Sequence, residues 1–320
     1  MASVNTSADA SPTSNPFTSL IASHGSVAAL LGAGISTSVG IPDFRSSSGL
    51  YSSLSSPSTL ASLGLSDPTD LFSHDHFLHD PTGFYKWSPA LNTGHLSPSP
   101  FHLYLASLPN LLRIYTQNID GLELEAGSPP SKVVQCHGRK DTASCLRCGK
   151  HSEIPAFTGD VLRCKCYEDP GPAPSRSSSR RPSRPRSDTC GGVLRPDVTF
   201  FGLPLPRAFS MSLGKDRGKT DLVLVAGTSL KVKPFSSVPS VLGGRKVLLN
   251  REVVGELSDW DSVFLCDVDA VLDFEGFKEV KAGGPAVWVG PGGVWPMKDK
   301  GNEAKKRERE EEKEKEKEKE

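Results

Sequence analysis

The sequence contains no long hydrophobic run, and no segment comes near the roughly 18 apolar residues that a membrane-spanning helix needs. Residues 1–17 lack both a basic stretch and an apolar stretch, which excludes a secretory signal peptide. They also lack arginine and contain Asp9, which argues against a mitochondrial transit peptide. We therefore expect a soluble intracellular protein without membrane contact, whose seven cysteines are free or bind metal rather than form disulfides.

Apolar residues are scarce for an α/β protein, at 36% of 320 residues, because polar residues crowd into a few segments. Positive and negative side chains balance at 37 each, but residues 305–320 contain only Lys, Arg and Glu. We predict that residues 299–320 form a disordered or single-helix tail, and that residues 1–15 are disordered. The Arg-, Ser- and Pro-rich residues 170–187 read as a disordered insert. Residues 46–100, rich in Ser, Pro and His, predict a flexible loop with short helices on the substrate side.

Short apolar runs predict the strands of a buried parallel sheet. Four of them are Val27–Leu31, Leu111–Tyr115, Leu222–Ala226 and Lys246–Leu249, and Ala270–Phe274 is a weaker fifth. Each of the first four ends directly in small or polar residues. Since ligands of open parallel sheets bind beyond the carboxyl ends of the strands, these four strand ends indicate one shared crevice.

The stretch after the first of these strands, GAGISTSVGIPDFR at residues 32–45, indicates a dinucleotide site. Gly32, Ala33 and Gly34 allow the backbone to turn close to a pyrophosphate. The usual G-x-G-x-x-G spacing is absent, because the next glycine is Gly40. This departure argues against a nicotinamide dehydrogenase, and the polar and aromatic segment from Pro42 to Arg45 adds groups that hydride transfer does not need.

The cysteines of residues 145–190 predict a structural zinc site. Cys145 and Cys148 form a C-x2-C knuckle, and Cys190 precedes the turn residues Gly191 and Gly192. Since Cys164 and Cys166 are separated by one residue, they are poorly spaced to bind one tetrahedral ion together. We predict a ligand set of Cys145, Cys148, Cys190 and either Cys164 or Cys166. Four thiolates leave no open coordination position, so the ion is structural; a redox C-x2-C pair is the alternative.

A polar cluster after the second strand is suited to ribose chemistry. Gln117, Asn118 and Asp120 supply two amides and a carboxylate that can fix ribose hydroxyls and polarise a nicotinamide. His137 follows nearby in the sequence Gln-Cys-His-Gly. Because the pKa of histidine lies near neutrality, His137 is the natural base for a ribose hydroxyl.

Taken in order, GAGIS, GIPDFRS, TQNID, the following His-Gly, the C-x2-C pair, LRPDVTFFG, GTSLKVKPF and LLN resemble the sirtuin family of NAD-dependent protein deacylases. The resemblance covers residues 20–275, and its C-terminal motifs resemble the branch that deacetylates histones and other proteins in nucleus and cytoplasm. It implies an α/β fold, in which a Rossmann-like parallel sheet domain (residues 16–135 and 191–280) carries a smaller inserted zinc-binding domain (residues 136–190). The Arg/Ser insert and the charged tail are not family features.

The resemblance also implies the roles of individual residues. His137 would be the general base and Asn118 a second catalytic residue. The NAD crevice would be formed by Gly32, Ala33, Gly34, Ser36, Asp43, Phe44, Arg45, Gln117, Asn118, Ile119, Asp120, Gly227, Thr228, Ser229, Asn250, Arg251 and Cys266. The acyl-lysine peptide would contact Val198, Thr199, Phe200, Phe201, Gly202 and Val232.

The implied reaction consumes NAD as a co-substrate and yields nicotinamide, deacetylated lysine and acetyl-ADP-ribose. The peptide would lie as an added strand between Val198–Gly202 and Lys231–Phe235. Two residues depart from the family: Thr199 stands in place of an aliphatic residue, and Leu203 in place of a glutamate. The second change is expected to weaken any preference for basic residues beside the acetyl-lysine.

We therefore predict an NAD-dependent protein-lysine deacetylase of the nucleus or cytoplasm that acts on histones or other acetylated proteins. The alternatives are a long-chain deacylase or mono-ADP-ribosyltransferase on the same fold, and a non-catalytic scaffold that binds acetyl-lysine. The insert has five arginines and no acidic residue between residues 171 and 187, which suits nonspecific contact with nucleic acid.

Overall fold

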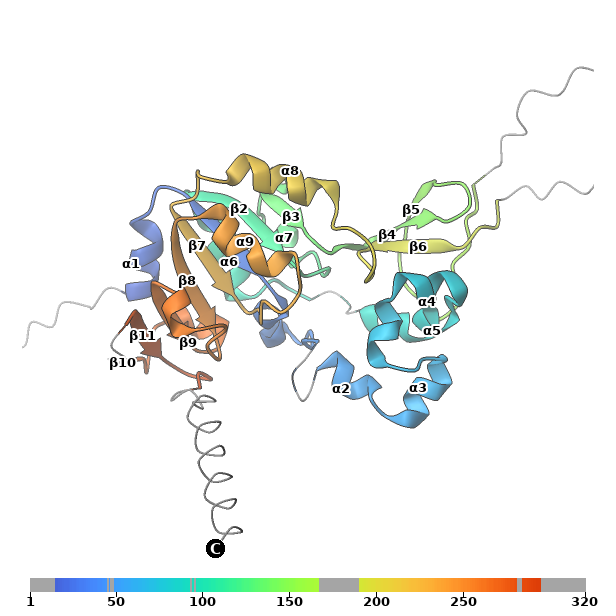
Figure 1. The fold of residues 1–320 in the computed structure, drawn as a ribbon, viewed down its shortest axis with the longest axis horizontal. Helices are drawn as coiled ribbons and strands as arrows, with labels where there is room; N and C mark the ends of the chain where they lie inside the picture. Colours follow the sequence, from blue (N-terminus) through green and yellow to red (C-terminus); the bar gives the residue numbers. More distant parts are fainter. Residues whose placement is uncertain are drawn as a thin grey trace, which may run out of the picture.

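The computed structural model describes residues 15–44, 46, 49–92, 94, 96–166, 190–280 and 284–294. The disorder predicted for residues 170–187 and 299–320, and for all but the last of residues 1–15, therefore lies outside the described residues. Eight strands form a large sheet in the order β10-β11-β9-β8-β7-β1-β2-β3, parallel except for β10 (Figure 1). Their bounds are β1 Val27–Leu31, β2 Leu111–Thr116, β3 Val133–Gln135, β7 Leu222–Ala226, β8 Arg245–Asn250, β9 Ser262–Leu265, β10 Lys278–Val280 and β11 Ala286–Val289.

Helices cover both faces of this sheet. Alternate residues of β1 face opposite ways, so Ala29 and Leu31 join one buried cluster while Ala28 and Leu30 join the other. The first cluster includes residues of α1 (Pro16–Ala22) and α6 (Pro100–Ser107), and the second includes residues of α8 (Arg207–Asp216) and α9 (Val238–Leu242). A short helix, α7 (Leu122–Glu125), follows β2. Within the described part of the chain, no helix combines the length and apolar character needed to cross a bilayer.

The predicted strand at Ala270–Phe274 is wrong. The segment Val268–Val271 is a short 3-10 helix, and the neighbouring strand of β8 is instead β9. The amide of Asn15 donates to the carbonyl oxygens of Val271 and Leu272 at 2.8 and 2.9 Å, and the Asp269 carboxylate accepts from the Phe101 backbone at 2.9 Å. These contacts attach the segment to the starts of α1 and α6, whereas the prediction had it pair as a strand of the sheet.

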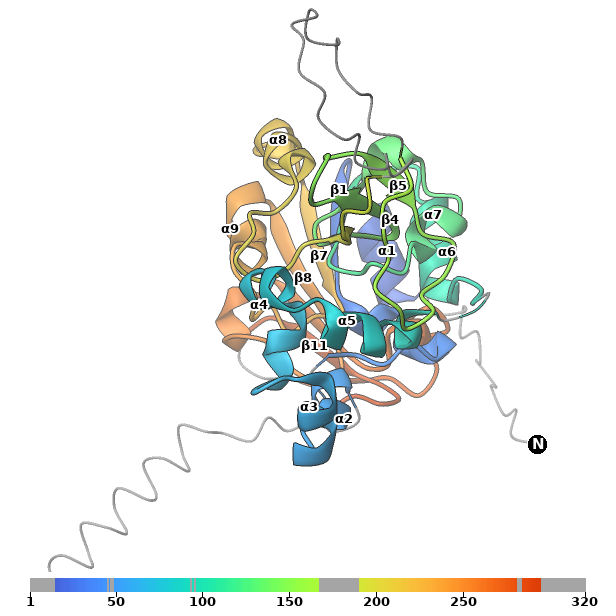
Figure 2. The same ribbon diagram turned by 90° about the vertical axis from the view of Figure 1, so that its right-hand side faces the viewer.

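A second, antiparallel sheet has the order β5-β4-β6, with bounds His151–Glu153, Gly138–Cys145 and Leu194–Val198. The helices α2 (Leu50–Leu54), α3 (Pro57–Leu63), α4 (His74–His79) and α5 (Thr82–Trp87) lie beside it (Figures 1 and 2). They pack around a buried cluster that includes Phe77, Phe84 and, from the end of β6, Phe200. The short helices predicted for residues 46–100 are present, but they form a packed layer rather than a flexible loop.

Two features depart from the predicted domain ranges. β6 lies beyond residue 190 and yet pairs with β4 in the small sheet. The helices α2–α5 also fall within the range assigned to the Rossmann-like domain, and their buried side chains join the cluster of the small sheet.

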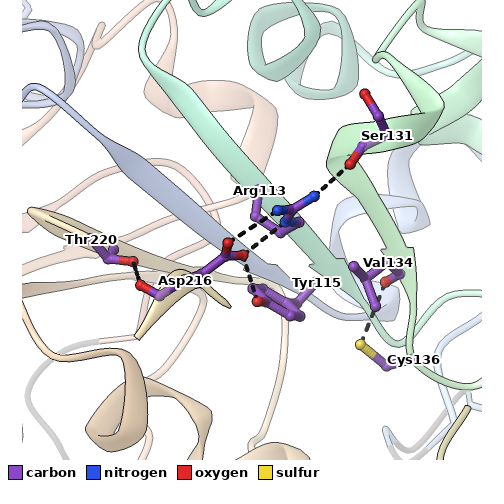
Figure 3. A network of polar contacts seen from close by, with 7 residues as sticks. All are labelled: Arg113, Tyr115, Ser131, Val134, Cys136, Asp216 and Thr220. Carbon is purple, nitrogen blue, oxygen red and sulfur yellow. Dashed lines mark hydrogen bonds and ion pairs between the residues drawn. The ribbon is translucent and has the colours of Figure 1, made fainter. Parts of the chain in front are cut away.

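An ion pair fastens α8 to the large sheet (Figure 3). Arg113 of β2 donates to both carboxylate oxygens of Asp216, at 2.7 and 3.0 Å, and the Tyr115 hydroxyl donates to the same carboxylate at 2.7 Å. The Asp216 side chain is 3% exposed. Burial acts to raise the pKa of Asp216, but the hydrogen bonds from Arg113 and Tyr115 outweigh it and hold the pKa below its usual value.

Candidate functional site

A cavity of about 940 Å³ lies at the carboxyl ends of the parallel strands, as predicted from the strand ends. This volume is in the range of pockets that hold a cofactor-sized ligand. Most of the predicted nucleotide-site residues line it, together with the predicted base His137: Ala33, Gly34, Asp43, Phe44, Gln117, Asn118, Ile119, Gly227, Thr228, Ser229, Asn250 and Arg251. All six predicted peptide-contact residues line it as well: Val198, Thr199, Phe200, Phe201, Gly202 and Val232.

Four predicted residues lie behind the cavity wall rather than in it. Gly32 and Ser36 accept hydrogen bonds from the side chain of Asn118, and Asp120 accepts one from Ser36. Cys266 is fully buried in the core beneath the sheet, and its backbone N–H donates to the Asn250 carbonyl at 2.9 Å. Arg45 lies outside the described residues.

The loops after β1 and β7 interlock at the cavity. The backbone N–H groups of Gly32 and Gly34 donate to the carbonyl oxygens of Ala226 and Gly227, at 3.1 and 2.8 Å. A Cβ at Gly34 would lie 2.7 Å from the Gly227 Cα, and one at Gly32 would lie 2.6 Å from the Thr228 Cβ. These two glycines therefore permit loop-on-loop packing, and their N–H groups already have partners within the protein.

A chain of hydrogen bonds holds the Asn118 side chain. Its amide nitrogen donates to the Gly32 carbonyl at 3.2 Å and to the Ser36 hydroxyl oxygen at 3.3 Å. Ser36 in turn donates to Asp120 at 2.8 Å, and Asp120 accepts from the backbone of Leu122 at 3.0 Å. Asn118 is thus fixed in orientation by the GAGIS loop, although it comes from the end of β2.

Gln117 and Thr228 join two strand ends across the cavity wall. The Thr228 hydroxyl donates to the Gln117 side-chain oxygen at 2.7 Å. Because these residues follow β2 and β7, which flank β1 in the sheet, the contact spans the GAGIS loop. The polar groups of three neighbouring strands are therefore tied together.

His137 follows β3, and its imidazole lines the cavity with its ring centroid 6.4 Å from that of Phe235. Burial lowers the pKa of His137, and a hydrogen bond with the Gln117 backbone opposes this shift only in part. A lowered pKa favours the neutral ring at pH 7, which is the state that a general base requires. The Thr199 N–H donates to the His137 carbonyl at 2.8 Å and links this residue to the peptide-contact segment.

Several residues of the peptide-contact segment already have backbone partners within the protein: Val198 pairs with Gly138 of β4, the Thr199 N–H is bonded to His137, and both backbone groups of Phe201 are bonded. The Phe201 N–H donates to the Phe72 carbonyl at 2.7 Å, and the Phe201 carbonyl accepts from the His74 N–H at 3.0 Å. An added strand would therefore have to pair with other backbone groups of the segment. The Phe201 side chain is 43% exposed and, with Phe44, gives the cavity an apolar rim.

Four cysteines converge at the far end of the small sheet. The sulfur atoms of Cys145, Cys148, Cys164 and Cys190 all lie within 4.8 Å of one another. The separations Cys145–Cys190 of 3.6 Å and Cys148–Cys164 of 3.8 Å match the edge of a tetrahedron with Zn–S bonds of about 2.3 Å. This arrangement fits a structural zinc ion, and Cys164 rather than Cys166 belongs to the four-thiol cluster.

Cys166, the other candidate for that position, is a fifth thiol beside the four. Its sulfur lies 2.9 Å from that of Cys164 and 3.2 Å from that of Cys148, which is closer than two ligands of one zinc ion approach. The Cys190 N–H donates to the Cys166 carbonyl at 2.9 Å, so the two residues that flank the insert lie side by side.

Sequence reasoning missed three residues that line the cavity near Asn250: Glu252, Val268 and Val294. Glu252 is adjacent to the predicted residue Arg251 and Val268 is two residues after Cys266, so extending those motifs would have found them. Val294 lies beyond the end of the family resemblance, and no motif indicates it. Another missed group is Glu123, which is buried beside Asp120; burial and that neighbouring charge raise its pKa to about 8.

Comparison with known proteins places this geometry in a family. The model of the Sir2 family matches residues 32–234. The NAD-dependent protein deacetylase HST1 of Saccharomyces cerevisiae is 38% identical over 276 residues, which cover 80% of this chain and 53% of that protein. The NAD-dependent histone deacetylase SIR2 of Eremothecium gossypii is 36% identical over 312 residues, which cover 89% of this chain and 53% of that protein.

Similarity extends to animal proteins and to solved structures. Mouse NAD-dependent protein deacetylase sirtuin-3 is 38% identical over 235 residues, which cover 72% of this chain and 63% of that protein. A structure presented as the basis for the mechanism and regulation of Sir2 enzymes superimposes with a TM-score of 0.63 at 26% identity, over 80% of this chain and 93% of the other. The chain spans about half the length of the two fungal proteins. With more than half of its residues matched by the family model, the chain belongs to the Sir2 family.

Proposed function

We propose that this chain is an NAD-dependent protein-lysine deacetylase. The observation that carries the proposal is that His137, two amides and an apolar peptide-side wall meet in one cavity. The names of the fungal and mouse relatives support the same activity. NAD would be consumed, and the bound dinucleotide would supply the ribose carbon that receives the acetyl group.

The residues of the cavity divide into three tasks. Thr228, Ser229 and Asn250 would hold the adenosine half of NAD, while Asp43, Gln117 and Asn118 would hold the nicotinamide half. His137 would take the proton of a ribose hydroxyl, which its lowered pKa allows at neutral pH. Ser36 and Asp120 act through Asn118, because their hydrogen bonds set the orientation of its amide.

The substrate would be an acetylated lysine in an extended peptide, with a histone tail as the favoured source. The peptide would run between Val198–Gly202 and Lys231–Phe235, and backbone pairing would give affinity with little sequence preference. Leu203, which lines the cavity, brings no charge to attract basic neighbours of the acetyl-lysine. Such substrates would place the protein in the nucleus or the cytoplasm. Residues 170–187 would make any nonspecific contact with nucleic acid.

The test is incubation of an acetylated histone peptide with and without NAD, followed by measurement of nicotinamide release and of peptide mass. We expect one nicotinamide per acetyl group removed, and loss of turnover by about 10²-fold or more in His137→Ala. His79→Ala, which alters an exposed histidine of α4, is the matched control. Deacetylation that persists without NAD would contradict the proposal. Peptide binding without turnover would support the non-catalytic scaffold instead. Transfer of ADP-ribose onto protein would support the mono-ADP-ribosyltransferase.

A further inference from the structure

An exposed apolar side chain stands at one end of the cavity without a role in the proposed chemistry. Val294 lines the cavity beside Asn250 and Arg251, and 58% of its surface is exposed. It is carried by the turn after β11, a strand that extends the sheet past β9. This part of the chain lies outside residues 32–234, over which the family model matches.

The position of Val294 is fixed by its backbone. Its N–H donates to the Arg251 carbonyl at 2.8 Å, and the Asp267 N–H donates to the Pro291 carbonyl at 2.7 Å. The turn lies so close to the end of β9 that a Cβ at Gly293 would be 2.0 Å from the Leu265 carbonyl oxygen. The turn therefore holds Val294 against the loops that follow β8 and β9.

The order of strands decides which half of a dinucleotide would reach Val294. His137 follows β3 and Asn118 follows β2, whereas Asn250 and Val294 belong to the opposite end of the row, beyond β7. Strands lie about 4.8 Å apart, so the ends of β3 and β8 are separated by roughly 19 Å. If the nicotinamide ribose lies beside His137, the adenosine half must lie toward β8.

We propose that Val294 contacts the adenine ring of the nucleotide and sets the affinity of this chain for the adenosine half of NAD. The inference rests on the proposed use of NAD. The physical reason is that the flat face of an aromatic ring would cover a side chain that water otherwise contacts, beside the buried Val268, which also lines the cavity. The β10–β11 extension thus adds a further strand end to the nucleotide site, beside those of β1, β2, β7 and β8.

The experiment measures binding of two probes by calorimetry: ADP-ribose, which contains adenosine, and nicotinamide mononucleotide, which does not. We expect the Kd for ADP-ribose to rise about tenfold in Val294→Asp and by two- to threefold in Val294→Ala. The effect of alanine is small because a valine that is only partly covered contributes only part of the free energy of complete burial. Val294→Phe, which enlarges the contact, should tighten binding. The Kd for nicotinamide mononucleotide should not change. Leu103→Asp, at an exposed leucine of α6 with 53% of its surface accessible, is the matched control.

Equal ADP-ribose affinity in wild type and Val294→Asp overturns the inference, whatever the deacetylase activity. So does an equal loss of affinity for both probes, because it would indicate general disruption of the sheet edge. A wild-type chain that binds ADP-ribose in the predicted manner but does not deacetylate peptides would refute the proposed activity alone. A wild-type chain that does not bind ADP-ribose would refute both.

Discussion

Replacing Asp216 with alanine would remove the carboxylate that joins α8 to β2. The change deletes two hydrogen bonds from Arg113 and one from Tyr115, and it leaves both donors with reduced access to water. Breaking a buried ion pair by removing one partner costs about 3–5 kcal/mol. The Arg113 side chain is 17% exposed and can regain some hydration, so we expect the lower end, about 3 kcal/mol.

Thermal unfolding followed by circular dichroism measures this effect. For a domain of this size a loss of about 3 kcal/mol lowers Tm by roughly 6–12 °C. Asp141→Ala is the control, since Asp141 forms the same kind of pair with Arg139 while the two side chains are 55% and 47% exposed; its cost should stay below about 1 kcal/mol. Equal Tm values for the two variants would refute the argument.

The pH dependence provides a second check on the same residue. Because the folded-state pKa of Asp216 lies below its usual value, its contribution is complete at neutral pH. It is lost as the pH falls through the folded-state pKa. The Tm difference between wild type and Asp216→Ala should therefore shrink in strong acid, and a difference that grows there would contradict the sign.

Three other predictions concern the site. Since burial lowers the pKa of His137, the acidic limb of kcat/KM should have its midpoint below pH 6.5, and a midpoint above 7 would argue against His137 as the base. Cys164→Ser should lose zinc as measured by atomic emission, while Cys166→Ser should retain one ion per chain; the reverse pattern would exchange their roles. Gly34→Ala should destabilise the chain by about 1–3 kcal/mol and raise KM for NAD, because its Cβ meets backbone at 2.7 Å. Gly214→Ala, where a helical Cβ meets nothing, should be neutral or stabilising.

The strands β1 and β7 were predicted with correct limits because each is a run of five apolar residues buried on both sides of a parallel sheet. β9, at Ser262–Leu265, was not predicted although it too is a short apolar run. The apolar residues from 270 to 274 fit the pattern of a strand equally well. In the fold, Asn15 donates to the carbonyl oxygens of Val271 and Leu272, and the neighbouring Asp269 accepts from Phe101. Such contacts join residues more than 150 positions apart, and local pattern does not encode them.

The site, like the fold, was predicted from local sequence only in part. Strand ends and motifs indicated the cavity, since both follow from short segments of sequence. The choice between Cys164 and Cys166 depended on sulfur positions that the C-x-C spacing leaves open. The interpretation of Gly32 and Gly34 also changed, because their packing partner, the loop after β7, is almost 200 residues away. The residue roles carried over from the family remain predictions.

The hydrogen bond between Cys190 and Cys166 has a consequence for protein engineering. The two ends of the insert leave the folded chain as neighbours, held by this bond and by the adjacent cysteine cluster. Joining neighbouring points with a longer or shorter connection changes the loop entropy only slowly with length. A fluorescent domain or an affinity tag placed here would therefore report on the chain from a permissive position, outside the residues that line the cavity.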